Sequence, residues 1–154
     1  MKNRSDEIIY LMRTHSGHGY RHIKAELLTV FVRYEWQTNR WAMIVEPDTN
    51  EVLGWISWYN LDESSLKQVE QYGLPGCFAK NIPLGKGPHL YLSNVVVREA
   101  VPSGVFNLLV NMAKQANPHA QSVNAHLWNR DTPVWRWSSF THTMTENRRV
   151  AVCH

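Results

Sequence analysis

His89-Leu-Tyr-Leu-Ser-Asn-Val-Val-Val-Arg98 is an extended, β-branched run whose apolar residues scarcely alternate with polar ones. This pattern predicts a strand that is buried on both faces. An amphipathic helix follows almost at once, with apolar residues at helical spacing: Val105, Leu108, Leu109, Met112 and Ala113. Ser103 is expected to cap its first turn, and Asn117-Pro118 is expected to end it.

A second β-rich run, Ser122 to Trp128, comes after this helix. The order strand, short turn, helix, strand predicts a βαβ crossover whose two strands are parallel neighbours. In such a unit the first backbone N–H groups of the helix lie beside the carboxyl end of the first strand. The turn Val101-Pro-Ser-Gly104 is therefore a natural site for a phosphate or an oxyanion, although it could equally be no more than a helix start.

The chain before this unit predicts two helices and a hairpin. The helices should lie at about 5–13 and 20–35, and the antiparallel strands at 41–45 and 52–59. The second helix is expected to turn one apolar face inward, made of Tyr20, Ile23, Leu27, Phe31 and Tyr34.

Shorter segments complete the chain. A short helix should cover about 62–72, and an irregular loop rich in Gly and Pro should cover 73–88. A helical turn over 131–137 and a closing strand or hairpin over 141–152 follow the crossover. Together these elements predict one domain over residues 1–154, of the α/β (α+β) class, with a mixed central sheet and helices on both faces.

Composition narrows the function classes. Seven Trp among 154 residues are more than packing needs, so some are expected to line a cleft. A net charge of +3 allows an acidic partner, such as a nucleotide, a carrier protein or nucleic acid, and demands none. Cys77 and Cys153 lack metal-type spacing and suggest reduced thiols, with one disulfide left open. Without a membrane-length apolar run or a signal peptide, we expect a cytoplasmic protein.

The order of elements resembles the Gcn5-related N-acetyltransferase (GNAT) fold. Asn124-Ala-His-Leu-Trp-Asn129 and Trp137-Ser-Ser-Phe140 are similar to the late signature of that family. In the family, the strand before the crossover ends at a turn whose amides hold the pantetheine and pyrophosphate of an acyl-CoA. The resemblance therefore implies acetyl-CoA or another acyl-CoA as donor, held by Val96, Val97, Arg98, Ser103, Gly104, Val105 and Asn129.

A closer similarity is to toxin-activating lysine acyltransferases, which take the acyl group from acyl carrier protein. Ser57-Trp58-Tyr59-Asn60-Leu61 and Ser16-Gly-His18 are the matching segments. Two departures matter: the first leaves the donor open, and the second means that the His–Asp pairing of this branch is not reproduced. The usual Gly-x-Gly turn is reduced to one Gly in Arg98-Glu-Ala-Val-Pro-Ser-Gly104, and the family's catalytic Asp aligns near Ser93 or Asn94.

Acyl transfer to an amine needs a held thioester, a polarised carbonyl and a base. His18 lies between glycines and is the first candidate for the base, with His22 as a fallback, although loop histidines are usually solvent-exposed bystanders. Ser93 and Asn94 could orient an acyl carbonyl or a water, or could simply be satisfied by neighbours. His89 and His126 lie on strands and could meet, but no spacing predicts a metal site.

Three functional hypotheses follow. The first is an N-acyltransferase that moves an acyl group from acyl-CoA, or from acyl carrier protein, to an amine such as a protein lysine or a small molecule. The second is a catalytically inactive structural or protein-binding subunit with this fold, motivated by the reduced turn and the missing Asp. The third is a nucleic-acid-binding or nucleic-acid-modifying protein, which rests on the positive charge and on Trp135-Arg-Trp137.

Overall fold

The structure is a computed structural model that describes residues 2–15, 19–101, 103–129 and 134–141. Its helical elements are α1 (Ser5–Thr14), the short 3₁₀ helix η2 (Tyr20–His22), α2 (Ala25–Gln37), α3 (Glu63–Ala79) and α4 (Val105–Ala116). Its strands are β1 (Trp41–Val45), β2 (Val52–Leu61), β3 (His89–Val97), β4 (Ser122–Asn129) and β5 (Val134–Thr141). No helix in these described ranges is both long and apolar enough to cross a membrane.

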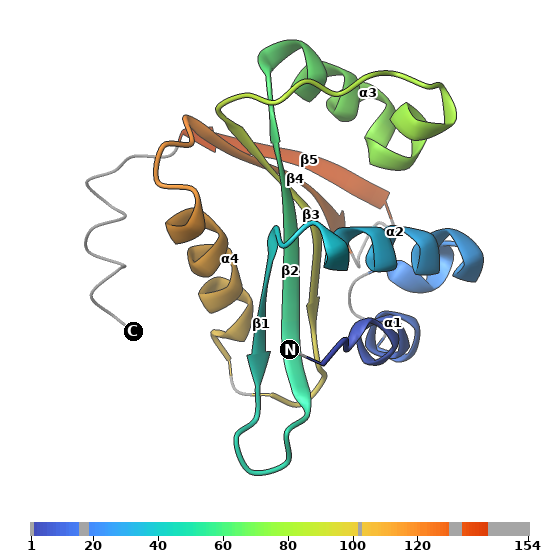
Figure 1. Cartoon of the computed structure of the whole chain (residues 1–154), viewed down its shortest axis with the longest axis vertical. Helices are drawn as coiled ribbons and strands as arrows, with labels where there is room; N and C mark the ends of the chain where they lie inside the picture. The colour runs from blue at the N-terminus through green and yellow to red at the C-terminus, as the bar shows by residue number, and fades with distance from the viewer. Residues whose placement is uncertain (1, 16–18, 102, 130–133, 142–154) are drawn as a thin grey trace.

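The strands form one mixed sheet in the order β1-β2-β3-β4-β5. β1, β2 and β3 are antiparallel neighbours, β3 and β4 are parallel, and β4 and β5 are antiparallel. Helix α4 covers one face of the sheet, while α1, α2 and α3 lie on the other (Figure 1). The predicted fold class, the hairpin and the parallel βαβ crossover are therefore confirmed.

The two faces of the sheet carry separate apolar cores. Trp55 is fully buried against α1 and α2, together with Ile8 and Val32. Trp58 packs on the opposite face with Leu109 of α4. Residues an odd number apart on a strand point to opposite faces, so the two Trp side chains serve different cores. Full burial of one large apolar side chain stabilises the fold by about 1.5–3 kcal/mol.

The predicted second helix is wrong at its start and on its inward face. Ile23 is extended (φ −94°, ψ 138°) and separates η2 from α2. This break resets the helical phase, so the buried residues of α2 are Leu28, Val32 and Glu35. Tyr34, which was expected to face the core, is 51% exposed. The inward face of α2 therefore contains a carboxyl group.

Three further element predictions need correction: the helix over 62–72, the irregular loop over 73–88 and the helical turn over 131–137. α3 does not end at residue 72, because Gly73 (φ 71°, ψ 164°) kinks it and helix resumes to Ala79 with Pro75 in the new first turn. Val134 to Trp137 belong to β5 and are not helical, while 131–133 and 142–152 lie outside the described residues.

The cap of α4 is also different from the prediction. Gly104, and not Ser103, occupies the N-cap position, in the left-handed conformation (φ 100°). No side chain in the described part of the chain caps this end, and Ser103 is exposed. A glycine suits this position because residues with a Cβ rarely adopt such a φ.

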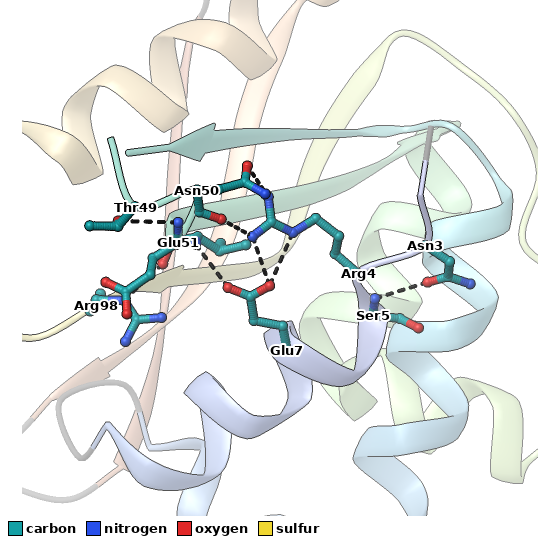
Figure 2. A network of polar contacts seen from close by, with 9 residues as sticks. Asn3, Arg4, Ser5, Glu7, Thr49, Asn50, Glu51 and Arg98 are labelled. Carbon is teal, nitrogen blue, oxygen red and sulfur yellow. Dashed lines mark hydrogen bonds and ion pairs between the residues drawn. The ribbon is translucent and has the colours of Figure 1, made fainter. Parts of the chain in front are cut away.

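A polar network fastens α1 to the turn of the hairpin (Figure 2). The Arg4 guanidinium donates to Glu7 Oε2 at 2.8 Å and also to Asn50. Glu7 Oε1 accepts the backbone N–H of Val52 at 2.9 Å, and Arg98 Nε donates to the Val52 carbonyl at 2.9 Å. The network joins α1, the start of β2 and the end of β3.

Candidate functional site

The parallel strands β3 and β4 pair over a short length and then separate. Their register runs from His89 opposite Ser122 to Leu92 opposite Ala125. β3 continues to Val97 and β4 to Asn129 without further pairing to each other. The sheet therefore has an opening at the carboxyl ends of its two parallel strands, where ligands bind in many α/β proteins.

A β-bulge lies at the edge of this opening. Ser57 of β2 pairs with Asn94, but Trp58 pairs with Leu92, so Ser93 is an extra residue in β3. An extra residue shifts the alternation of side chains by one position. Ser93 and Asn94 consequently both point to the face covered by α2, as their shared partner Glu35 shows.

Glu35 of α2 is 1% exposed and accepts hydrogen bonds from three side chains. Ser93 Oγ donates to Oε2 at 2.5 Å, while Ser57 Oγ and Asn94 Nδ2 donate to Oε1 at 2.7 and 2.5 Å. Among the described residues, no lysine or arginine forms an ion pair with this carboxyl. Burial raises the pKa of Glu35, and the hydrogen bonds from Ser93, Ser57 and Asn94 only partly offset that effect.

Three buried tyrosines from three different elements surround this carboxyl. Burial raises the pKa of Tyr20, Tyr59 and Tyr91, and the charge of Glu35 raises each further. The Tyr59 hydroxyl lies near Glu35 but has no well-formed hydrogen bond to any described residue. The tyrosines therefore remain neutral near pH 7, and Glu35 is the acidic group in this cluster.

A cavity of about 700 Å³ opens over the bulge, between α2, α3 and the separated strands. Its polar floor contains Ser93 and Asn94. Its walls are largely apolar or aromatic and include Leu27, Leu28, Phe31, Leu74, Tyr91 and Trp135. This size and lining are typical of small-molecule sites. Tyr20 is buried in the core, as predicted, and also lines this cavity, whereas Leu27 is 39% exposed and lines the cavity without being buried.

His126 of β4 lies on the cavity wall and is held from both sides. Its Nδ1 is 2.9 Å from the Tyr91 hydroxyl, and its Nε2 is 3.4 Å from the Glu70 carbonyl. A carbonyl can only accept, so Nε2 carries the hydrogen and Nδ1 accepts from Tyr91. Burial lowers the pKa of His126, so the imidazole is neutral at pH 7. His89 bonds Ser122 instead, so the two strand histidines do not meet.

Tyr20 occupies the opening between the strands. Its hydroxyl accepts the backbone N–H of Val95 at 2.8 Å and donates to the Val95 carbonyl at 3.1 Å. Val95 lies beyond the last β3–β4 pair, where a continuing ladder would have placed β4. The Tyr20 hydroxyl thus satisfies the β3 groups that the departure of β4 leaves without a strand partner.

Aromatic side chains close the end of the opening next to η2. Trp128 stacks on His22 with ring centroids 5.1 Å apart, and Trp135 packs against both Trp128 and Tyr20. Gly19 (φ 76°) fits beneath Trp128, where an added Cβ would come within 2.4 Å of the ring. Only glycine satisfies both constraints at this position.

The residues predicted to be catalytic have different outcomes. Ser93 and Asn94 lie together on the cavity floor. His18 lies outside the described residues, and His22 lines the cavity rim. His15, which precedes that segment, accepts the backbone N–H of Glu99 at 2.6 Å. It therefore contacts the turn between β3 and α4.

The residues predicted to bind the donor are not all brought together. Gly104 and Val105 form the open start of α4, with empty space beside the Gly104 Cα. Val96 is fully buried in the core next to α1, and Val97 packs on the α4 side. Arg98 bonds the Val52 carbonyl in the network of Figure 2. These side chains therefore have structural contacts, and the backbone N–H of Arg98 donates to the Leu53 carbonyl on the β2 side. The Asn129 side chain lies outside the described residues.

Sequence reasoning missed Glu35, which organises the floor. The signal was present, because Leu28, Val32 and Glu35 have the spacing of one helical stripe and a carboxylate on an apolar stripe is unusual. The bulge that turns Ser93 and Asn94 to the same face has no comparable signal in the sequence. Within the described residues, no group of three or more His, Cys, Asp or Glu side chains could hold a metal ion.

Comparison with solved structures identifies the fold. The chain is similar to the GNAT-like decarboxylase GphF in complex with isobutyryl-CoA, with a TM-score of 0.56 and 15% sequence identity. The match covers 80% of this chain and 60% of the neighbour, so this chain spans well under two thirds of that protein. No protein-family model and no curated protein matches the sequence. The fold is GNAT-like, as predicted, and the similarity to toxin-activating acyltransferases stays a prediction.

Proposed function

With a GNAT-like fold as the premise, we propose that this protein binds an acyl thioester in the opening between β3 and β4 and transfers the acyl group to an amine in the adjoining cavity. The observation that supports the proposal most strongly is the end of the β3–β4 pairing at Leu92 and Ala125, directly beside the cavity floor. The solved neighbour of the same fold is in complex with isobutyryl-CoA.

The donor side of the proposed site is built from backbone groups. No described side chain caps the first N–H groups of α4, and no described residue fills the space beside Gly104, so a phosphate or pantetheine amide fits there. The N–H of Val95, now bonded to the Tyr20 hydroxyl, is the group that can polarise a thioester carbonyl. Binding of the donor then requires the Tyr20 hydroxyl to release this N–H.

The transfer step conserves atoms and protons. The amine nitrogen attacks the thioester carbon, a C–N bond forms, and the C–S bond breaks to release a thiolate, which becomes the free thiol when it recovers the proton that the amine gives up. The excess proton of the amine passes to Ser93 Oγ as Ser93 passes its own proton to Glu35, 2.5 Å away. A carboxyl whose pKa is raised by burial is a stronger base than an exposed one. His18 remains a proposed base on the basis of sequence alone.

Donor binding is tested by thermal unfolding with acetyl-CoA, longer acyl-CoA and acylated carrier protein. A donor at about 100 times its dissociation constant should add about 2.7 kcal/mol to the free energy of unfolding. Release of free thiol in the presence of lysine peptides or small amines then measures transfer. If none of the donors stabilises the chain, thioester binding is contradicted and the hypothesis of a non-catalytic subunit is favoured.

Decarboxylation of an acyl thioester is a second candidate, because the solved neighbour is a GNAT-like decarboxylase. Polarisation of the thioester carbonyl by Val95 N–H would stabilise the enolate that forms as CO₂ leaves. The cavity floor supports amine transfer better, since Ser93 and Asn94 have their hydrogens directed to Glu35 and not to a substrate carboxylate. CO₂ release from malonyl-CoA without an amine would favour decarboxylation.

A further inference from the structure

The polar hydrogens of Ser93 and Asn94 on the cavity floor are directed mainly to the buried carboxyl of Glu35. Ser93 directs its O–H to Glu35 Oε2, and Asn94 directs its amide N–H₂ to Glu35 Oε1 and, more weakly, to the Ser57 and Ser93 hydroxyl oxygens. Among the described residues, the groups of these two cavity-lining side chains that remain without a hydrogen-bond partner are a lone pair of Ser93 Oγ and the amide oxygen of Asn94. Both are hydrogen-bond acceptors.

We propose that Glu35 is a positioning residue that sets the hydrogen-bonding polarity of the cavity floor, so that the cavity selects a primary amine on an apolar body. This inference rests on the proposed function for the role of the cavity as the acceptor side. Glu35 itself is 1% exposed and does not touch the ligand. It acts through Ser93 and Asn94, which it orients by two hydrogen bonds of 2.5 Å.

The rest of the cavity fits the apolar part of such a ligand. Leu28, Phe31 and Leu74 provide apolar wall, and the Tyr91 ring adds an aromatic face that favours a nearby cation. Lys24 and Glu70 lie at the rim, both exposed and of opposite sign, so neither sign dominates at the entrance. A ligand carboxylate on the floor would lie against the acceptor oxygens of Ser93 and Asn94, with the Glu35 carboxyl behind them. Its binding would be unfavourable, because no donor would replace its water.

In the neutral pH range, Glu35 is the group whose ionisation changes the charge at the cavity floor. Tyr20 from η2, Tyr59 from β2 and Tyr91 from β3 face Glu35, and their raised pKa values keep them neutral in the neutral range. His126 on the cavity wall is neutral there because burial lowers its pKa. Binding of an ammonium ligand should therefore strengthen as pH rises through the raised pKa of Glu35.

The test uses benzylamine, benzyl alcohol and benzoate, which are similar in size but differ in charge and hydrogen-bonding character. Their dissociation constants are measured by NMR titration of the full chain without any donor. The wild type should bind benzylamine at least about tenfold more tightly than the other two, since a hydrogen bond to a charged group contributes about 1.5–3 kcal/mol. Benzoate binding as tightly as benzylamine, or no binding of benzylamine, would overturn the proposal.

Glu35→Gln tests the positioning role directly. The new amide N–H₂ must donate to Ser93 or Asn94, which forces one of them to turn a hydrogen toward the cavity. The variant should lose the tenfold preference for benzylamine and its dependence on pH. Ser57→Ala is the matched control, because Ser57 bonds the same carboxyl but does not line the cavity. It should retain the preference for benzylamine, and its pH dependence should move to higher pH because the carboxyl loses one of the hydrogen bonds that lower its pKa.

The outcome separates this inference from the proposed function. A preference for benzylamine that survives Glu35→Gln would show that Glu35 does not set the polarity of the floor, whatever the donor results. Selective amine binding by a chain that no acyl thioester stabilises would support the inference and contradict acyl transfer. Both measurements use the folded chain, and far-ultraviolet circular dichroism confirms that each variant folds.

Discussion

Glu7 of α1 and Glu35 of α2 both reach the same face of the sheet, but in opposite electrostatic settings. Glu7 is 33% exposed, forms an ion pair with the Arg4 guanidinium, and is also influenced by the charge of Arg98 in the network of Figure 2. Burial acts to raise the pKa of Glu7, but the Val52 N–H, Arg4 and Arg98 outweigh it and lower that pKa. Glu35 is fully buried, is bonded by neutral donors alone among the described residues, and has a raised pKa.

This difference suggests different roles for the two carboxyls. Glu7 makes a structural contact, whereas Glu35 is a candidate functional residue. A carboxylate that joins α1 to the hairpin needs a cation to offset its desolvation, and Glu7 has one. Retaining a buried carboxyl without a cation costs stability, which packing alone does not explain. Strongly perturbed groups of this kind cluster at functional sites, and Glu35 lies directly beneath a cavity.

The largest expected effect comes from removing each carboxyl in turn. Glu35→Ala leaves the buried donors of Ser57, Ser93 and Asn94 without their acceptor, so the free energy of unfolding should fall by about 3–5 kcal/mol. Glu7→Ala should cost about 1 kcal/mol, because water can reach the groups that it leaves. Urea unfolding followed by tryptophan fluorescence measures both. Equal losses would remove the distinction between the two sites.

The two carboxyls should also give opposite slopes of stability against pH. Glu7 has a lowered pKa, so its contribution is present above its ordinary value of 4.5 and is lost as pH falls through the lowered pKa. Glu35 has a raised pKa, so its contribution is present below 4.5 and is lost as pH rises through the raised value. A shift of one unit corresponds to about 1.4 kcal/mol.

Two variants show which carboxyl causes each dependence of stability on pH. Glu7→Gln should flatten the loss of stability on the acid side, and Glu35→Gln should flatten the loss that begins above pH 4.5. Urea unfolding at a series of pH values measures the slopes. If Glu35→Gln leaves the limb above 4.5 unchanged, the pKa of Glu35 is not raised and its proposed part in proton transfer fails.

Substitution of a tyrosine near Glu35 should change stability less than removal of the Glu35 carboxyl, and a tyrosine on α1 provides the control. Tyr20→Phe removes the hydroxyl from the Val95 N–H and carbonyl, and should lower the free energy of unfolding by about 1–2 kcal/mol. It also frees the groups that the proposed donor would bond, so acyl-CoA should bind more tightly to this variant than to the wild type. Calorimetry of acyl-CoA binding measures the change.

The control for this variant lies on α1, beside Glu7. Tyr10 is 62% exposed, and Tyr10→Phe should change neither stability nor donor affinity. If Tyr20→Phe weakens donor binding, the hydroxyl supports the site and does not compete with the donor. If it changes stability alone, the donor does not use the Val95 backbone.

Much of the fold followed from hydrophobic periodicity. The non-alternating run of β3, the stripe of α4 and the turn between β1 and β2 each specify an element locally, and together they predicted the parallel crossover. Local patterns could not predict the break at Ile23 or the kink at Gly73, because tertiary packing decides whether a helix continues. The hairpin and the parallel neighbours β3 and β4 were predicted, but β5 was not, because 131–137 was expected to be helical.

The candidate site was less accessible than the fold. Ser93 and Asn94 were identified as polar residues in a buried strand, but alternation alone would have put them on opposite faces. The bulge that unites them is visible only in the register with β2. Tyr20 reaches Val95 across 75 positions of sequence, a contact that no local motif encodes. Sites assembled from distant segments therefore need the structure.

Substitution of Arg98 should give the smallest effect. It tests whether the Arg98 guanidinium supports the contacts between α1 and the hairpin or binds the donor. Sequence resemblance assigned Arg98 to the donor, but the structure places its Nε on the Val52 carbonyl and its charge beside Glu7. Arg98→Ala should therefore lower the free energy of unfolding by about 1 kcal/mol, and raise the pKa of Glu7 toward its ordinary value. A donor contact would instead weaken acetyl-CoA binding much more than acetyl-pantetheine binding, because the latter lacks the nucleotide phosphates. We expect equal affinity changes for the two donors, since a guanidinium held by α1 and the hairpin is not free to follow a pyrophosphate at the start of α4.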